Sequence, residues 1–510
     1  MKRDGATISL WQDTVQDVNL PAGSNTGSFD VLVVGGGITG ITTALLLQKR
    51  GLQCAVAEAH TLCFGTTGGT TSHINTFFDT SYDQIQSDFG TEAAKLVAKA
   101  TNQARDLFQQ HVEEYKIDCG FEEKNGYLFA VDDQQAEELE KIYEASREAG
   151  VDVEWVDKIP VPVSFVKAVI YRRQAQIHPT RYVMALANAF TDMGGMIMEN
   201  CRVENTDKQE EWLDVKTAKG TIRAKHLIYA THIPPHINLL HFRNAPYRSY
   251  AIAVQLADNR YPNSLAYDMY DPYHYYRTQN IDGTNYLIIG GEDHKTAHQE
   301  NTEACFNNLI AHARQHFDVA TVTHRWSSQY FEPSDGLAYI GHLPGASDNV
   351  YVATGYSGNG ITYSHIAAIT LADLITKGES EYAALFRPGR VKPVAGFMEF
   401  VKENADVVAQ FVGKRLGADK IESLVEIAPG EGRLVKYEGT TLAVYKDEMG
   451  KIYALNPVCT HAKCVVDWNR AEKTWDCPCH GARYNLNGDV ITGPAHRGLE
   501  KVEIEDLIKE

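Results

Sequence analysis

The chain has 510 residues, of which 44% are hydrophobic, and its formal net charge is −18 at pH 7. Its length predicts more than one domain, with ample apolar material for the cores. The acidic balance argues against nucleic acid and anionic membrane surfaces as partners, because both attract clustered lysine and arginine.

Residues 1–28 are expected to form an N-terminal extension without a targeting signal, because they lack the apolar core of a secretory signal. The longest apolar stretch, residues 31–48, is rich in glycine and threonine, so we expect no stable membrane insertion. Five cysteines stand singly, as is typical of buried free thiols in a cytoplasmic protein. They are Cys54, Cys63, Cys119, Cys201 and Cys305.

A glycine pattern stands between two predicted strands near the start of the chain. Residues 31–34 form a short apolar run suited to a buried parallel strand, and residues 41–49 carry helix-forming residues that end before Gly51. A second strand is expected at residues 54–57, directly before Glu58. The turn between strand and helix has the spacing G-x-G-x-x-G, formed by Gly35, Gly37 and Gly40.

This arrangement predicts a dinucleotide site. Gly35 permits a tight turn, Gly37 lets the backbone approach a pyrophosphate, and Gly40 lets the helix pack closely on the strand. The phosphates are expected at the helix N-terminus, where free N–H groups favour negative charge. Glu58 is expected to accept a hydrogen bond from a ribose hydroxyl group.

The stretch FGTTGGTTSHIN, residues 64–75, favours FAD over NAD through its resemblance to a known family. It resembles the flavin-embracing segment of the D-amino-acid oxidase-like (glycine oxidase-type) FAD family. Further segments that resemble this family are residues 194–205, 225–232, 287–294, 331–345 and 349–362. The resemblance spans residues 29–393 and implies a Rossmann-like α/β domain for FAD/NAD(P) binding, interleaved with a mixed-sheet substrate domain.

The resemblance also implies which residues hold FAD. Val203 is expected to contact the adenine through its backbone, and the turn within residues 349–362 to enter a helix whose dipole stabilises negative charge on the reduced flavin. The expected FAD-binding residues are Gly35, Gly37, Ile38, Thr39, Gly40, Glu58, Thr66, Thr67, Val203, Gly355, Gly358, Gly360 and Ile361.

The middle of the chain predicts the two interleaved lobes. Helices are expected at residues 133–150 and 180–195, and sheet strands at residues 248–256, 273–279 and 285–291.

Four residues in this region are expected to act at the substrate. Tyr250, Tyr275 and Arg277 lie on strands that resemble the family's substrate-facing sheet, and an arginine there could clamp a carboxylate in a bidentate manner. Core aromatics and a surface arginine are the alternative interpretation. His294 follows the pair Gly290-Gly291 at a strand end, and a role near the substrate and a structural role are both open.

Two short motifs near the C-terminus carry metal-ligand spacing. CTHAKC occupies residues 459–464 and CPCHG occupies residues 477–481. A tetrahedral zinc site is the main competitor, but zinc fingers usually present paired cysteines and then paired histidines. Here each loop supplies one cysteine and one histidine, as a Rieske [2Fe–2S] centre requires. The expected ligands are Cys459, His461, Cys477 and His480.

The same region resembles Rieske domains beyond the ligands. The resemblance implies a disulfide between Cys464 and Cys479, a hydrogen bond from Tyr484 to a ligand thiolate, and a proline loop at residues 493–495 that covers the cluster. Ala482 stands where high-potential members carry a serine that donates to a bridging sulfide. Losing this donor predicts a reduction potential below that of respiratory Rieske proteins.

Residues 394–418 predict a connector helix, and residues 419–510 a small antiparallel β domain of Rieske type. The two resemblances together imply a dehydrogenase that oxidises a C–N bond of an amine or amino acid. Its electrons would pass from FAD to the [2Fe–2S] cluster and on to an external acceptor, a quinone or a redox protein. The alternative is a reductase fed by NAD(P)H that delivers electrons through the cluster to a partner, although no second G-x-G-x-x-G stands in the chain.

Overall fold

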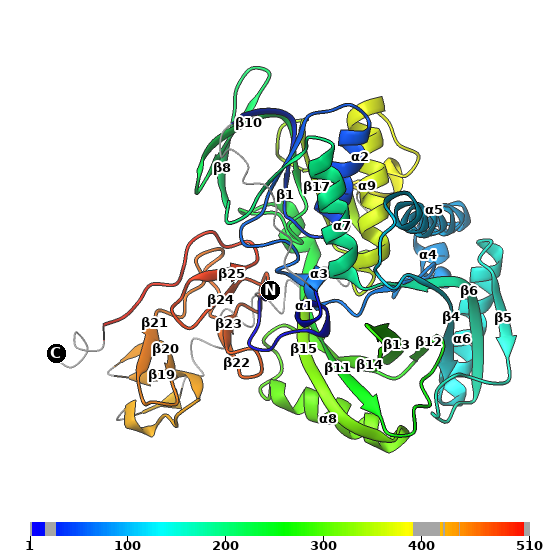
Figure 1. Cartoon of the computed structure of the whole chain (residues 1–510). Helices are drawn as coiled ribbons and strands as arrows, with labels where there is room; N and C mark the ends of the chain where they lie inside the picture. Colours follow the sequence, from blue (N-terminus) through cyan, green and yellow to red (C-terminus); the bar gives the residue numbers. More distant parts are fainter. Residues whose placement is uncertain (1–2, 16–26, 391–418, 422–423, 438, 504–510) are drawn as a thin grey trace.

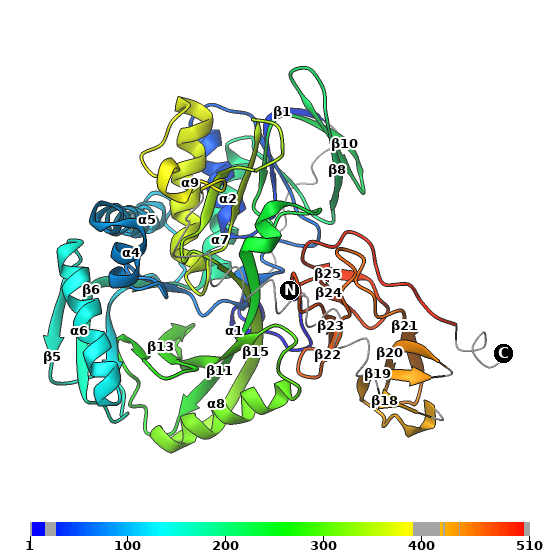
Figure 2. The ribbon, with the colours of Figure 1, turned by 180° about the vertical axis from the view of Figure 1, so that it is seen from behind.

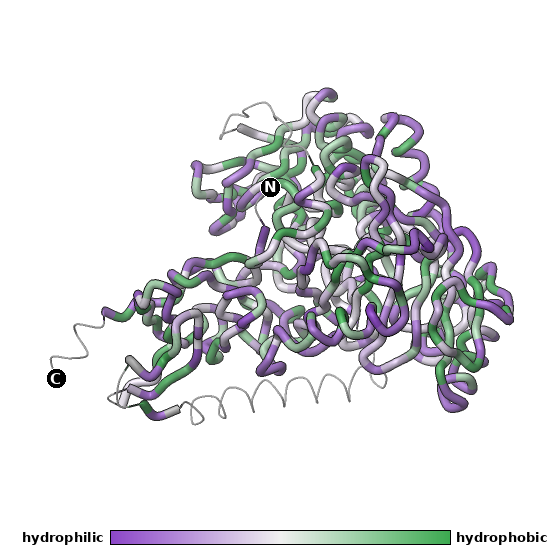
Figure 3. The backbone as a smooth tube through the Cα atoms, turned by 60° about the horizontal axis from the view of Figure 1, so that its bottom comes forward, coloured by the Kyte–Doolittle hydropathy of each residue, from purple (hydrophilic) through white to green (hydrophobic). Residues whose placement is uncertain are grey.

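The computed structural model describes residues 3–15, 27–390, 419–421, 424–437 and 439–503. Two lobes lie one above the other, and a smaller C-terminal domain lies beside them (Figures 1 and 2). In Figure 3 the hydrophobic stretches run through the interior, and hydrophilic ones follow many outer loops. The connector helix predicted at residues 394–418 lies outside the described residues.

The first lobe is built on a largely parallel sheet with the order β16-β17-β10-β1-β2-β7, joined by the hairpin β8–β9. β1 lies between β2 and β10 and is parallel to both. The strand bounds are β1 Gly27–Val34, β2 Cys54–Ala57, β7 Met196–Met198, β8 Val203–Lys208, β9 Leu213–Thr217, β10 Gly220–Tyr229, β16 Tyr339–His342 and β17 Val350–Thr354. The apolar run before Gly35 is therefore a buried central strand, as predicted.

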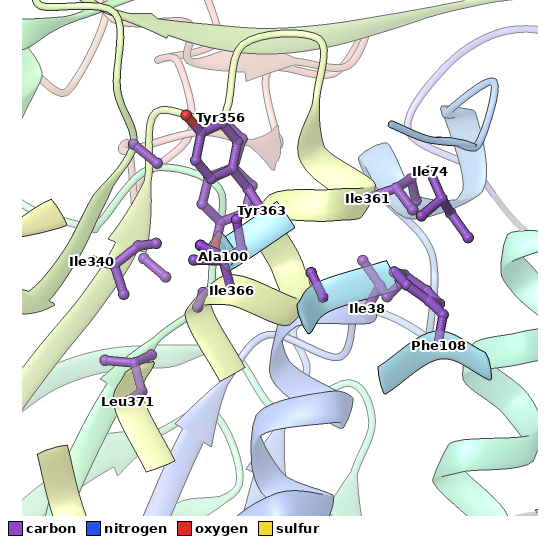
Figure 4. Close-up of a cluster of buried hydrophobic side chains, with 14 of the residues drawn as sticks. Ile38, Ile74, Ala100, Phe108, Ile340, Tyr356, Ile361, Tyr363, Ile366 and Leu371 are labelled. Carbon is purple, nitrogen blue, oxygen red and sulfur yellow. The ribbon is translucent and has the colours of Figure 1, made fainter. Parts of the chain in front are cut away.

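Helices α2 (Ile38–Lys49), α7 (Pro179–Asp192) and α9 (Gly360–Lys377) cover one side of this sheet (Figure 1). Their apolar side chains share one core cluster with those of α5 (Thr91–Tyr115). Figure 4 shows Ile38 and Ile361, at the first turns of α2 and α9, among these buried side chains. The core thus holds the two helix N-termini in place.

The second lobe contains a sheet with the order β15-β11-β14-β13-β12-β4-β6-β3, with β5 beside β6. The strands predicted at residues 248–256 and 285–291 lie in β11 and β14, and the one predicted at residues 273–279 lies in β13 apart from Tyr273, which precedes it. The strand bounds are β3 His73–Ile74, β4 Glu122–Ala130, β5 Val153–Val156, β6 Lys167–Gln176, β11 Asn244–Leu256, β12 Leu265–Asp268, β13 His274–Ile281, β14 Thr284–Lys295 and β15 Val319–Pro333. α8 (Thr302–His316) packs against this sheet through Phe306 and Leu309 (Figure 2).

The remaining helices of the two lobes are short or peripheral. The helix predicted at residues 133–150 is confirmed as α6, and the one predicted at residues 180–195 is α7, three residues shorter at its C-terminal end. The other bounds are α1 Leu10–Asp13, α3 Thr66–Gly69, α4 Tyr82–Phe89, α6 Asp133–Glu148, α10 Ala383–Phe386 and the 3₁₀ turn η1 Leu239–Arg243.

The C-terminal domain is the small antiparallel β unit expected from the sequence. Its two sheets have the orders β18-β19-β20-β21 and β22-β23-β24-β25. The bounds are β18 Asp419–Lys420, η2 Leu424–Glu426, β19 Gly432–Tyr437, β20 Thr440–Lys446, β21 Ile452–Leu455, β22 Asp467–Asn469, β23 Thr474–Asp476, β24 Arg483–Tyr484 and β25 Val490–Thr492.

A buried ionic cluster joins the C-terminal domain to the second lobe and to the N-terminal residues. We call it the polar interface; its members are Arg3, Asp4, Arg248, Glu472, Asp476 and Arg483, whose side chains are all at most 6% exposed. Arg483 Nη1 lies 2.8 Å from Asp4 Oδ2, and Arg248 Nη2 lies 3.2 Å from Asp476 Oδ2. Charges buried this deeply require their partners, so the cluster fixes the position of the C-terminal domain.

None of the helices in the described parts of the chain has an apolar stretch sufficient to cross a bilayer.

Candidate functional site

A cavity of about 330 Å³ lies where the two lobes and the C-terminal domain meet. Its first-lobe wall comes from the ends of β1 and β2 and the start of α2, and its second-lobe wall from β11, β13, β14 and β15. Ile491, Thr492, Gly493, Ala495 and His496 of the C-terminal domain complete the lining. Three parts of the chain therefore share one site.

The glycine turn has the geometry that a dinucleotide requires. Gly35 has φ +113°, a region that favours glycine, and a Cβ atom there would lie 2.4 Å from the carbonyl oxygen of Ala230. A Cβ atom on Gly40 would lie 1.9 Å from the carbonyl oxygen of Gly35, so only glycine allows α2 to pack this closely. Gly37, Ile38 and Thr39 line the cavity at the positive end of α2.

Glu58 lies at the end of β2, beside Val203 and Arg202 in the cavity wall. Its Oε2 accepts a hydrogen bond from the backbone N–H of Gly36 at 2.7 Å, and its Oε1 accepts one from the backbone N–H of His60 at 2.8 Å. Burial raises the pKa of Glu58. The predicted acid is thus held at the site, with oxygen lone pairs left for a ribose hydroxyl group.

Thr66 and Thr67, at the start of α3, face the same cavity. Thr67 Oγ1 accepts from the backbone N–H of Ile38 at 3.1 Å, and Thr66 donates to the carbonyl oxygen of Gln329 at 3.1 Å. This short helix therefore connects the glycine turn to β15 in the second lobe.

The turn between β17 and α9 forms the opposite wall. Gly358, Gly360 and Ile361 line the cavity at the positive end of α9. Gly355 does not line it; this residue has φ +71° and lies against Asn244, whose side-chain oxygen a Cβ atom would approach to 2.5 Å. Gly355 therefore serves to form the turn before α9. Gly40 likewise has a structural role, because it lets α2 pack closely against Gly35.

We predict that Gly40→Ala weakens FAD binding about 5- to 150-fold. The added methyl group must displace α2 from Gly35, and overpacking of this kind costs about 1–3 kcal/mol. Flavin content after dialysis measures the effect. Gly389→Ala is the control, because Gly389 has no atom within 4 Å of its Cβ position and does not have a positive φ angle. Equal flavin content in the two variants would contradict the assignment.

The predicted substrate residues separate into two groups. Tyr250 and Tyr275 line the cavity, whereas His294 and Arg277 do not. His294 Nε2 lies 2.9 Å from the Tyr250 hydroxyl group, so this histidine lies behind a residue of the cavity wall.

Arg277 is fully buried, and its guanidinium group stacks on Trp11 of α1 at 5.1 Å. Its Nη1 donates to the carbonyl oxygens of Thr71 at 2.8 Å and Ser72 at 2.6 Å. Burial lowers the pKa of Arg277 to about 9. This geometry supports neither the expected carboxylate clamp nor a surface arginine; Arg277 holds the segment after α3 onto β13.

Sequence reasoning missed four polar residues that line the cavity. Asp293 follows β14's paired glycines, and Asp79 follows the flavin-embracing segment by four residues. Ser249 and Tyr330 face the cavity from β11 and β15. Two of these residues are sequence neighbours of residues that were predicted to act at the substrate, which could have indicated them. Ser249 precedes Tyr250, and Asp293 precedes His294.

The four predicted metal ligands converge in the C-terminal domain. Cys459 and His461 follow β21, and Cys477 and His480 lie between β23 and β24. All four are buried, and the two imidazole rings lie 5.0 Å apart. None of the four imidazole nitrogens has a hydrogen-bond partner among the described residues, which is costly unless a metal fills the role.

The donor set fits two irons. Two buried cysteine side chains lie beside two imidazole rings, which is the set of two sulfur and two nitrogen donors that a Rieske cluster requires. The Tyr484 hydroxyl group and the backbone N–H groups of His461 and Ala462 act to lower the pKa of Cys459. Cys464 and Cys479 lie close to Cys477, but they form a disulfide with each other and cannot serve as thiolate ligands.

Two further details of the predicted centre are present. The disulfide Cys464–Cys479 ties the two ligand loops together. The Tyr484 hydroxyl group lies 3.2 Å from Cys459 Sγ. Ala482 is fully buried, and its methyl side chain offers no donor for a sulfide. The low reduction potential expected from Ala482 stays a prediction.

The fold and the two sites together define a flavin-dependent oxidoreductase that carries a Rieske domain. Residues 30–374 match the family described as FAD dependent oxidoreductase, and residues 420–503 match the Rieske [2Fe-2S] domain. The chain therefore belongs to the D-amino-acid oxidase-like family of FAD-dependent oxidoreductases and ends in a Rieske domain. Its cofactors are FAD and a Rieske [2Fe–2S] cluster.

A relative that matches nearly the whole chain is YhfW of Bacillus subtilis (strain 168), whose name describes a Rieske 2Fe-2S iron-sulfur protein. It is 30% identical over 502 residues, 98% of both chains. The gamma-glutamylputrescine oxidoreductase of Escherichia coli (strain K12) is 24% identical over 69% of this chain and 84% of its own. The crystal structure of glycine oxidase from Geobacillus kaustophilus superposes with a TM-score of 0.61 at 20% identity, covering 72% of this chain and all of that one, which supports the fold.

Proposed function

We propose that this protein is a dehydrogenase that oxidises a C–N bond of an amine or amino acid. In this proposal, electrons pass from FAD to the Rieske cluster and on to an external acceptor. When bound, FAD supplies the two-electron oxidation that removes a hydride and a proton from the substrate to form an imine, and the cluster supplies one-electron chemistry.

One observation carries this proposal: a single loop of the C-terminal domain contacts both sites. Gly493 lines the cavity, and a Cβ atom on it would lie 2.6 Å from the carbonyl oxygen of Gly481, the residue after the ligand His480. Gln329, also in the cavity wall, donates its side-chain amide to the same carbonyl oxygen at 2.9 Å. A shared wall of this kind supports electron transfer between the two sites.

The first lobe also reaches the cluster directly. His241 is 2% exposed, and its ring lies 4.6 Å from that of His461 and 5.6 Å from that of His480. The adjoining side chains Ile237 and Phe242 are 65% and 42% exposed. This apolar surface beside the imidazole ligands gives an acceptor, a quinone or a redox protein, an approach to the cluster.

The residues of the chain have separate tasks in this scheme. The positive ends of α2 and α9 hold the pyrophosphate and stabilise negative charge on the flavin. The second-lobe sheet orients the substrate, and the loop at residues 491–496 closes the cavity and excludes water from it.

Anaerobic mixing with a panel of amines and amino acids tests the proposal. We expect flavin absorbance to fall and the electron paramagnetic resonance signal of the reduced cluster to appear in the same reaction. Reoxidation by ferricyanide, a one-electron acceptor, should be faster than reoxidation by oxygen. If NADH reduces the flavin and none of the amines or amino acids does, the NAD(P)H-fed reductase is supported instead. If oxygen reoxidises the flavin as fast as ferricyanide does, the protein is not a dehydrogenase.

A further inference from the structure

One end of the cavity is lined by polar and aromatic side chains from four neighbouring strands and from Tyr273, which precedes β13. We call this end the amine pocket and define it by Ser249, Tyr273, Tyr275, Asp293 and Tyr330. The order β15-β11-β14-β13 places their strands next to one another. In the register, Tyr250 lies opposite Gly291 and Ser327, so residues distant in sequence meet at one end of the sheet.

Asp293 is at the centre of the amine pocket. Its Oδ1 accepts a hydrogen bond from Ser249, and its Oδ2 accepts one from the Tyr330 hydroxyl group at 2.9 Å. Ser249 Oγ also lies 3.0 Å from the Tyr275 hydroxyl group. These neighbours orient the carboxylate toward the cavity, and each oxygen retains a lone pair for a ligand.

A second carboxylate and several aromatic rings surround the same space. Asp79 accepts from the backbone N–H of Gly358 at 2.7 Å, at the turn before α9, and lines the cavity. The rings of Tyr273 and Tyr275 lie 5.8 Å apart. Aromatic faces and carboxylates are the groups that attract an organic cation.

The amine pocket offers no cation to a substrate carboxylate. Among the described residues that line the cavity, Arg202 is the only arginine or lysine, and it lies beside Glu58 and Val203, where the adenosine half is expected. Arg277 donates to backbone carbonyls outside the cavity. His73 lines the cavity, but burial holds its pKa well below the ordinary value and keeps it neutral.

We propose that the substrate is a cationic amine without a carboxylate on the reacting carbon, and that Asp293 binds its ammonium group. This inference rests on the proposed function and narrows its substrate class. An α-carboxylate in the amine pocket would face Asp293 and Asp79 without a compensating charge, which disfavours amino acids.

The electrostatics of Asp293 agree with this geometry. Burial, with a further contribution from Asp79 and Glu292, raises the pKa of Asp293 to about 7 despite the hydrogen bonds from Ser249 and Tyr330. A carboxyl group so placed gains from a cation, because a nearby positive charge favours its ionised form.

Binding of a cation that cannot be oxidised provides the first test. Tetramethylammonium has no N–H to lose and cannot form an imine. In the purified holoprotein we expect it to perturb the flavin spectrum saturably, sodium benzoate to have no effect, and Asp293→Asn to weaken the cation about tenfold or more. Asp258→Asn is the matched control, because Asp258 pairs with the exposed side chain of Arg260 and does not line the cavity. This variant should bind tetramethylammonium as the unmodified protein does.

Flavin content and melting temperature show whether each variant is folded. Asp79→Asn is a second variant that should also weaken binding of tetramethylammonium. A spectral response to benzoate at lower concentrations than to tetramethylammonium would overturn the inference. An unchanged tetramethylammonium affinity in both aspartate variants would also overturn it.

Matched substrate pairs provide the second test. Isoamylamine and leucine differ only by the carboxylate, as do benzylamine and phenylglycine. We expect anaerobic flavin reduction at least about tenfold faster with the amine of each pair. Faster reduction by the amino acids would overturn this inference and leave the proposed function standing. Cation binding that depends on Asp293, without reduction by any amine or amino acid, would overturn the proposed function and leave the cation site standing.

Discussion

Replacing Cys477 by serine is expected to remove iron and acid-labile sulfide from the protein while FAD remains bound. A serine hydroxyl group does not ionise at neutral pH, so one iron loses its thiolate ligand. Cys477 does not line the cavity, whereas Gly37, Thr66 and Ile361 of the expected FAD-binding residues do. The cluster should therefore be lost without loss of the flavin.

The Cys477→Ser variant should separate reduction of the flavin by the substrate from electron transfer to the external acceptor. Flavin reduction by the substrate should persist, and turnover with the external one-electron acceptor should fall to the level that the flavin alone supports. Iron and sulfide analysis, flavin absorbance and single-turnover kinetics measure these effects. Cys119→Ser, at a fully buried free thiol in the core of the first lobe, is the control and should keep its iron. Retained iron in Cys477→Ser would show that this cysteine is not a ligand.

The second large effect is expected at the polar interface. Arg483→Met leaves Asp4 and Asp476 buried without the guanidinium group that lies 2.8 Å from one and 3.3 Å from the other. Burial alone would raise the pKa of Asp476, but Arg483 and Arg248 hold it below its ordinary value, so the carboxylate stays charged. Removing one partner of a buried ion pair costs about 3–5 kcal/mol.

Urea unfolding of the holoprotein, followed by the visible absorbance of the cluster, measures the Arg483→Met loss. The control is Arg172→Met, because Arg172 and Glu154 form a pair with side chains 40% and 59% exposed and such pairs contribute about 0–1 kcal/mol. If the two variants lose the same free energy of unfolding, the polar interface does not stabilise the docked domain. Asp4→Asn should reproduce part of the Arg483→Met effect, because it removes the N-terminal partner of the same guanidinium group.

The local motifs of this protein could be read from the sequence alone. The glycine turn at Gly35, Gly37 and Gly40 depends on neighbouring residues, and its φ angle and close approaches follow from their spacing. The same holds for Cys459 with His461 and for Cys477 with His480, because each pair lies on one short loop. Motifs whose residues lie close together in the sequence can therefore be recognised without knowledge of the tertiary structure.

The tertiary structure decided what surrounds these motifs. Arg277 and Tyr275 are two residues apart on β13 and were both expected at the substrate, yet Trp11 of the N-terminal extension covers the guanidinium group while Tyr275 reaches the cavity. Asp293 becomes a cavity carboxylate because strand register brings it to Ser249 and Tyr330, which are 44 and 37 residues away in the chain. Strand pairing, helix packing and domain docking determine such contacts, and no local pattern encodes the partner.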